Sequence, residues 1–342
     1  MKKKPTSIAL VAEKAGVSSM TVSRIIRGES SVKEETRSRV IGVMKDLGYV
    51  PSAAAQSLRS RDHLRSSGKR LFALIFGKGT ESSVNFFHDI ARGVEQAAAE
   101  TGLYPIQIAP QQDAELSWLR LQTILSVGGL CGALLVGQFS IEDIQFIQSN
   151  VKEVVMVDGP APSGLRVESV EAGNLEGSLL ALDHLAALGC RKIALLTVNP
   201  DHYFAQAMEQ SASLRRTNEM DIKVYFDCRS SMDARAMVID LWRRGETFDG
   251  IFTNDDFAIG ALKAFHELKV VVPRDVKIVG FDDIQYASFT IPSLTSVRID
   301  KFQLGAEAVR TLALMTRSPE RAAGVRKIIK PTLVTRESTV SD

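Results

Sequence analysis

Side chains that can contact the edges of base pairs stand at the outward positions of one short helix pattern over residues 18–26. These side chains are Ser19, Met20, Ser23 and Arg24. A guanidinium can donate two hydrogen bonds to a single guanine, a contact worth about 1–3 kcal/mol of discrimination between bases. Met20 offers only apolar contact, of the kind that a thymine methyl group accepts. The set is therefore chemically able to contact base edges where this helix lies in the major groove of double-stranded DNA.

This chemistry requires a helix that is held at a fixed angle, and the surrounding sequence supplies one. Ser7 can cap a first helix over 8–14, and Ser18 can cap the second helix. Gly16 lies in the tight turn between them, where it adopts a positive φ without steric cost. A third apolar pattern over 34–47 would close a small core. The sequence therefore predicts a helix-turn-helix, whose second helix lies in the DNA groove.

The charge of the chain is divided unevenly. Residues 1–70 hold seven Lys and eight Arg against six Asp and Glu, which is a net charge of +9. Because the whole chain carries +2, residues 71–342 carry −7. A basic segment attached to an acidic body is typical of a module that binds a polyanion, although a charge run alone is equally compatible with a solvated face.

After a polar linker over 61–70, the chain alternates between short apolar runs and amphipathic stretches. Strands are predicted at 71–76, 104–108, 132–136, 153–157, 192–197, 222–226, 250–253 and 276–280. Helices are predicted at 87–100, 115–126, 175–188, 234–244 and 257–268. Such alternation indicates βαβ units and parallel sheets. The number of units favours two α/β subdomains, with a ligand between them at the carboxyl ends of strands.

The N-terminal segment resembles the lac/gal repressor family. The resemblance rests on the run VAEKAGVS at 11–18, on TVSR at 21–24 and on LGYVP at 47–51. It implies that Ser19, Met20 and Arg24 face base edges. It also assigns a wider set to the DNA-binding surface: Ser7, Ser18, Thr21 and Ser23. Two positions depart from the family pattern, Leu10 in place of Asp and Lys33 in place of a capping Ser.

Residues 52–59 form a helix pattern that is too short to be stable alone in water. We expect it to become helical on DNA, where a second copy packs against its small alanine face, which includes Ala55. In the family, paired hinge helices enter the minor groove and a leucine separates one base step. Leu58 is the matching residue here, and a wedge of this kind kinks DNA.

The remainder of the chain resembles the regulatory domain of the family and, through it, periplasmic sugar-binding proteins. The longest matches are VPRDV at 272–276 and GFDD at 280–283. By position, the resemblance assigns effector contacts to Phe86, Phe87, Asn254 and Asp282. Gln206 stands where the family often has an arginine that binds the ligand, and Arg229 is the candidate replacement charge. Both a sugar and an anionic effector are compatible with this set.

The predicted architecture is an N-terminal all-α helix-turn-helix head plus hinge helix, followed by an α/β domain of two doubly wound subdomains of periplasmic-binding-protein-like type. The expected boundaries are 1–51 for the head, 52–70 for hinge and linker, and 71–342 for effector sensing and dimerisation. Within the last, the first subdomain comprises about 71–160 plus 298–330, and the second about 161–297. The family pattern puts the three connections between subdomains near 158–167, 284–289 and 293–298.

The predicted function is that of a sequence-specific transcriptional regulator, a repressor that binds a pseudo-palindromic operator as a homodimer under allosteric control by a small molecule. We expect a cytoplasmic protein without a membrane segment, cofactor, metal or catalytic residue. An enzyme is the first alternative, but Gly77-Lys78-Gly79-Thr80 lacks the spacing of a phosphate-binding loop. A transport receptor is the second, and the helix-turn-helix argues against it.

Overall fold

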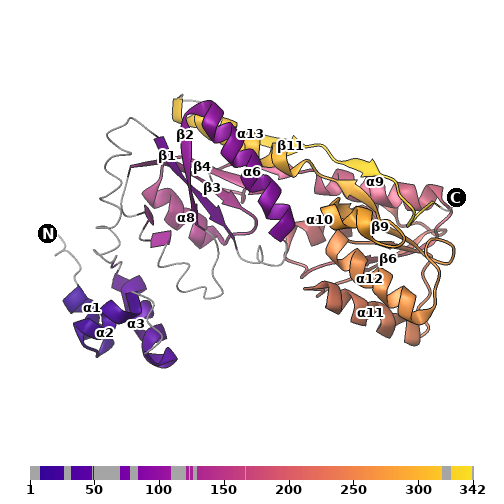
Figure 1. Ribbon diagram of the computed structural model, residues 1–342, viewed down its shortest axis with the longest axis horizontal. Helices are drawn as coiled ribbons and strands as arrows, with labels where there is room; N and C mark the ends of the chain where they lie inside the picture. The colour runs from indigo at the N-terminus through magenta and orange to yellow at the C-terminus, as the bar shows by residue number, and fades with distance from the viewer. Residues whose placement is uncertain are drawn as a thin grey trace.

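The computed structural model shows a small all-α unit, drawn in indigo, and two α/β units arranged along the long axis (Figure 1). The residues that it describes are 8–26, 32–47, 49, 70–77, 84–108, 121–122, 124–125, 129–165, 167–317 and 325–340. The expected hinge and most of the predicted helix over 115–126 lie outside them. So do Ser7, Ala55 and Leu58.

The all-α unit consists of α1 (Ile8–Ala15), α2 (Ser19–Ile26) and α3 (Glu34–Leu47). Its core is fully buried: Val11, Val22, Ile25, Val40 and Met44. Gly16 has a φ of 65° in the turn before α2, as its position predicted. Ser18 caps α2, because its Oγ accepts a hydrogen bond from the Thr21 main-chain N–H at 3.1 Å. The predicted helix-turn-helix is confirmed.

The first α/β unit is built on a six-stranded sheet in the order β11-β5-β4-β3-β1-β2, and every pair in it is parallel. The strands are β1 (Arg70–Phe76), β2 (Leu103–Ile108), β3 (Leu130–Val136), β4 (Val154–Asp158), β5 (Glu168–Ala172) and β11 (Arg326–Ile329). Alternate residues of β1 pack on opposite faces, beneath α6 (Val84–Thr101) and α13 (Lys301–Arg317) on one side and α8 (Ile141–Asn150) on the other. Burial on both faces explains the continuous apolar runs of the sequence.

The second α/β unit has a six-stranded sheet in the order β12-β10-β9-β8-β6-β7. The strands are β6 (Lys192–Leu196), β7 (Asp221–Tyr225), β8 (Gly250–Phe252), β9 (Lys277–Asp282), β10 (Thr295–Arg298) and β12 (Thr332–Val334), of which only β12 pairs antiparallel in this sheet. Its helices are α9 (Asn174–Ala187), α10 (Tyr203–Arg215), α11 (Ser231–Arg243), α12 (Asp255–Leu268) and the 3₁₀ helix η2 (Gln285–Phe289). All eight predicted strands are present to within two residues.

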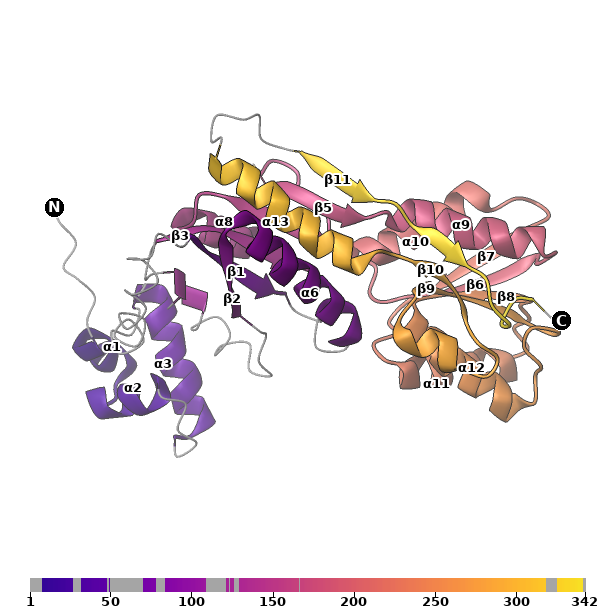
Figure 2. The same ribbon diagram turned by 45° about the horizontal axis from the view of Figure 1, so that its top comes forward.

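The chain passes between the two units three times: from β5 to α9, from β10 to α13, and from β11 to β12, a passage visible in yellow in Figure 2. The connections expected at 158–167 and 284–289 are therefore wrong. The first prediction failed because β5 was not recognised as a strand. It belongs to the first sheet, so the first segment of that unit extends beyond the expected residue 160. The segment 293–298 contains β10, which ends just before the second passage.

Helices α6 and α13 approach each other closely at two glycines. A Cβ added at Gly93 would overlap the main-chain oxygen of Phe302, and one added at Gly305 would overlap that of Ile90. We expect Gly93→Ala to force the helices apart and to destabilise the protein by about 1–3 kcal/mol. Thermal denaturation should show a melting temperature lower by about 2–4 °C for each kcal/mol lost. The matched control is Gly42→Ala in α3, where an added Cβ meets nothing within 4 Å. Equal melting of the two variants would contradict the packing argument.

Candidate functional site

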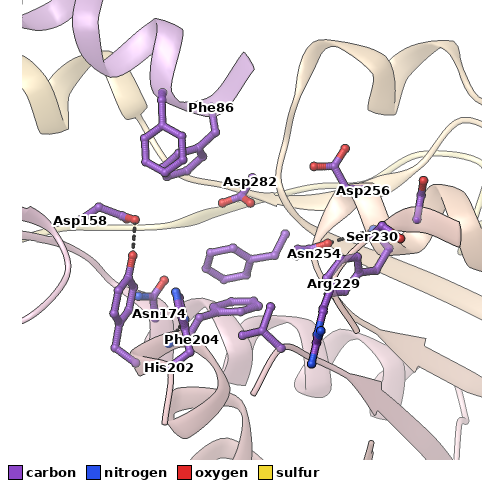
Figure 3. Close-up of a pocket in the computed structure, with 16 residues that line it drawn as sticks. Phe86, Asp158, Asn174, His202, Phe204, Arg229, Ser230, Asn254, Asp256 and Asp282 are labelled. Atoms are coloured by element: carbon purple, nitrogen blue, oxygen red, sulfur yellow. Dashed lines mark hydrogen bonds between the residues drawn. The ribbon is translucent and has the colours of Figure 1, made fainter. Parts of the chain in front are cut away.

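A cavity of about 280 Å³ lies at the carboxyl ends of strands from both sheets (Figure 3). Asp158 is the last residue of β4 and Asp282 is the last residue of β9, while Asn254, the N-cap of α12, lies just beyond the end of β8. Thr253 separates Asn254 from the end of β8. Phe86 on α6 lines the same space from the first unit. Because residues of both units line it, a ligand here would contact both at once.

Five of the six effector contacts expected from the sequence line this cavity: Phe86, Phe87, Arg229, Asn254 and Asp282. Gln206 does not, in contrast to the expectation. It lies on the exposed side of α10, and its side-chain nitrogen is 3.5 Å from the main-chain oxygen of Asp201. Tyr203 and Phe204 in the first turn of α10 line the cavity, whereas the Gln206 side chain turns back toward the loop before the helix.

Three carboxylates face the cavity: Asp158, Asp256 and Asp282. Burial raises the pKa of Asp282 to about 7; the ammonium of Lys301 opposes this shift, and the other two carboxylates add to it. Burial likewise raises the pKa of Asp158 to about 6. The hydrogen bond from Tyr203 and the charge of Lys301 both lower this pKa, but their effects are smaller than that of burial. Both groups therefore change protonation near neutral pH, and both can accept hydrogen bonds from a ligand once ionised.

The apolar walls are aromatic. The rings of Phe86 and Phe87 meet edge to face with centroids 5.0 Å apart, and those of Phe204 and Phe281 are 4.9 Å apart. Asn254 uses its Oδ1 to accept the Phe257 main-chain N–H at 2.9 Å, so its NH₂ group is what it can offer to a ligand. Aromatic faces with a few oriented polar groups are typical of small-molecule sites.

Sequence reasoning missed the other residues that line the cavity, among them Asp158, His202 and Tyr203. The Tyr203 hydroxyl donates to Asp158 Oδ2 at 2.6 Å, the dashed line at the left of Figure 3. His202 is kept neutral because burial lowers its pKa to about 4, and its Nδ1 accepts the Phe204 main-chain N–H. Asp158 could have been predicted as a cavity residue, since it directly follows the predicted strand 153–157. No sequence pattern indicated His202 or Tyr203.

The outward face of α2 is exposed as expected. Met20 retains 64% of its accessible surface, and Ser19 and Arg24 are also exposed. Ser18 Oγ lies 2.9 Å from Thr21 Oγ1 in addition to capping the helix. Ser23 lies within α2. Since Val22 and Ile25 fill the core behind it, this helix presents its polar face to a partner.

Other kinds of site find little support in the described part of the chain. No helix there has both the length and the apolar composition to cross a membrane. No cluster of three or more His, Cys, Asp or Glu side chains able to hold a metal ion occurs among the described residues. Cys131, Cys190 and Cys228 are free thiols.

Comparison with known proteins decides the family. Residues 7–52 match the family "Bacterial regulatory proteins, lacI family", and residues 182–339 match the "Periplasmic binding protein-like domain". The ribose operon repressor of Halalkalibacterium halodurans is 30% identical over 344 residues, which cover 98% of this chain and 97% of that protein. This chain belongs to the lacI family. As a lacI-family protein, it is a transcriptional regulator that binds DNA through its helix-turn-helix.

Solved structures of lacI-family proteins have the same fold. The regulator CelR in its cellobiose complex superposes with a TM-score of 0.67 at 25% identity, over 97% of this chain and 99% of that one. The lac repressor dimer bound to operator and the anti-inducer ONPF also gives a TM-score of 0.67, at 24% identity, over 99% and 100% of the two chains. The predicted combination of a helix-turn-helix head with a two-subdomain α/β fold is confirmed.

Proposed function

We propose that this lacI-family protein is a repressor that binds a pseudo-palindromic operator as a homodimer and whose affinity for the operator is set by a small molecule in the cavity. The observation that carries the proposal is the placement of Phe86 and Asp282, which line one cavity from two units joined by three connections. A ligand that contacts both favours one closure angle, and a change of angle can be transmitted to the DNA-binding heads.

The effector in this proposal is a sugar rather than an anion. Three carboxylates line the cavity against one arginine, Arg229, which is exposed. Buried carboxylates repel an anionic ligand but accept hydrogen bonds from sugar hydroxyl groups. The aromatic walls suit the apolar faces of a sugar ring. CelR was solved with cellobiose, and one relative is a repressor of a ribose operon, which agrees with this class of ligand.

The DNA-binding part of the proposal assigns residues 1–51 to the head and 52–70 to hinge and linker. Arg24 and Met20 read base edges, and Ser7, Ser18, Ser19, Thr21 and Ser23 complete the surface on DNA. A single head buries too little surface for tight binding, so pairing through the sensor domains supplies affinity and aligns two heads with two half-sites. The cavity binds its ligand without converting it, and the protein acts in the cytoplasm.

Leu58 is proposed as the hinge wedge, with Ala55 on the small face against which a second hinge packs. We expect Leu58→Ala to weaken operator binding by more than about tenfold, because unstacking of a base step costs a few kcal/mol and the inserted leucine side chain offsets that cost. Dimerisation and sugar binding should be unchanged, since the proposal assigns both to residues 71–342. A gel-shift titration measures the loss, and unchanged operator affinity would remove the wedge from the proposal.

Reciprocal coupling tests the proposed function. A preferred duplex is first selected from random DNA, and D-ribose, cellobiose and D-gluconate are then titrated by calorimetry with and without that duplex. Any sugar that changes operator affinity must show its own affinity changed by the same factor. We expect this for a neutral sugar and not for gluconate. Identical sugar affinities in the two conditions would rule out coupling, and coupling to gluconate alone would reverse the choice of effector class.

A further inference from the structure

Lys301 is a buried lysine at a junction between the two α/β units. It is the first residue of α13, immediately after the chain has crossed from β10, and only 7% of its surface is exposed. Its Nζ donates a hydrogen bond to the main-chain oxygen of Asp282, which ends β9 in the other sheet. The same ammonium lies 5.6 Å from the ring centroid of Phe86 on α6. One side chain therefore joins an element of each unit beside the cavity.

Asp282 has a backbone conformation that needs such support. Its φ is 101°, a region that non-glycine residues rarely adopt and that costs about 1–3 kcal/mol unless the surroundings fix it. The Lys301 bond fixes the carbonyl group of this residue, while the carboxylate lines the cavity. Among the described residues, that carboxylate accepts no hydrogen bond, so it is available to a ligand.

The geometry points to Lys301 as a positioning residue of the effector site, which ties the end of β9 to α13 and holds the Asp282 carboxyl group toward the cavity. This inference rests on the proposed function in one respect, that the cavity is the effector site. Lys301 itself is outside the cavity lining. It would act through Asp282, and it would set the closure angle at which both units contact a ligand.

The charges around Lys301 fit this role. Its ammonium lowers the pKa of both Asp282 and Asp158, against the larger effect of burial, which raises them. The other titratable groups that interact with this carboxylate pair come from three elements. They are Tyr203 on α10, Asp255 and Asp256 on α12, and Glu171 on β5. None of these four is a second cation. Among the described residues, Lys301 is thus the cation that lowers the pKa of both carboxyl groups, whereas Arg229 in the cavity lining is exposed.

The sign of the expected pH effect follows from linkage. A carboxyl group whose pKa is higher in the folded than in the unfolded state binds more protons when folded, so stability falls as pH rises from the unfolded to the folded pKa. For Asp282 that interval ends at about 7. Removal of Lys301 should raise this pKa by about one unit or more, which extends the loss of stability to higher pH.

Melting of the full-length protein from about pH 5 to about pH 8 tests the inference with three variants: K301M, K301R and K330M. Lys330 is an exposed lysine at the third passage between the units, so K330M is the matched control. We expect K301M to lower the melting temperature more at about pH 8 than at about pH 5. The decrease in stability with rising pH should end about one pH unit higher in K301M than in the parent protein. K301R, which keeps the charge, and K330M should follow the parental profile.

A second background guards against a K301M protein that fails to fold. Asp282→Asn removes the carboxyl group. The stability of this variant should therefore fall less steeply with rising pH than that of the parent, because the folded variant binds about one proton fewer. An equal loss for K301M at both ends of the pH range, or a pH profile unaltered by Asp282→Asn, would overturn the inference. These measurements need neither DNA nor sugar, so their failure is separable from failure of the coupling experiment.

Discussion

Arg24→Ala should reduce operator affinity by about 100-fold or more. Each guanidinium is proposed to donate two hydrogen bonds to a guanine, worth about 1–3 kcal/mol, and a dimer loses two such contacts. Arg24 is exposed on α2, so the substitution leaves the core of the head intact. Fluorescence anisotropy with the selected duplex at fixed salt measures the change. Melting of the variant should remain that of the parent.

The matched control for this experiment is Arg39→Ala, which removes the same charge from an exposed position on α3. A lost phosphate contact weakens binding to all duplexes about equally, whereas a lost base contact also relaxes the sequence preference at one position. We therefore expect a preference change only for Arg24→Ala. Equal losses for the two variants, on operator and random duplex alike, would show that Arg24 does not read a base.

Asp282→Asn should weaken sugar binding by about 100-fold while leaving operator affinity in the absence of sugar unchanged. A carboxylate can accept two charge-assisted hydrogen bonds from a sugar, each worth about 1.5–3 kcal/mol, and an amide presents an NH₂ group in place of one acceptor. Calorimetry with the sugar that passes the coupling test measures the loss. Asp221→Asn, at an exposed aspartate that begins β7 and lies outside the cavity lining, is the control.

The pH dependence of sugar affinity provides an independent check. Because the pKa of Asp282 is raised to about 7, this carboxyl group is mostly protonated at about pH 6 and mostly ionised at about pH 8. Sugar affinity should therefore rise over that interval in the parent protein and stay nearly constant in Asp282→Asn. Affinity that falls with rising pH would mean that the protonated form binds, and would contradict the assigned role.

The helix-turn-helix was predictable because its signals are local. Ser18 at the N-cap and Gly16 in the turn act within four residues of the helix that they start, so the sequence alone predicts α2 to within one residue. The central strands were equally clear, since burial on both faces requires uninterrupted apolar runs such as that of β1. These elements needed no knowledge of distant residues.

Strand β5 was not predictable, because its burial depends on a residue far away in the chain. It contains Glu168 and Glu171, both nearly fully buried, and two acids in five residues resemble a loop. Arg326 on β11 donates to Glu171 at 2.8 Å across a separation of 155 residues. A buried charge with a partner is tolerated where an isolated one is not. Because β5 was not predicted, the first connection between the units was expected before this strand, whereas it follows the strand.

The cavity was predicted in part for a related reason. Residues at strand ends, such as Asn254 and Asp282, can be placed by the rule that ligands bind there. Asp158 also ends a strand, but its electrostatic coupling to Asp282 depends on how two sheets are joined, which no local pattern reveals. Gln206 lies outside the cavity lining, because a match to one family position does not fix the direction in which this side chain points.

The measurement that tests the account most directly is an equilibrium titration of the full-length protein against the selected pseudo-palindromic duplex and a shuffled duplex of equal composition. At about 200 mM salt, the selected duplex should bind at least about a thousand times more tightly, and at about 50 mM salt both should bind more strongly, as phosphate contacts require. Equal affinity for the two duplexes, or no binding to either at the lower salt, would contradict the assignment of α2 as a helix that reads DNA sequence.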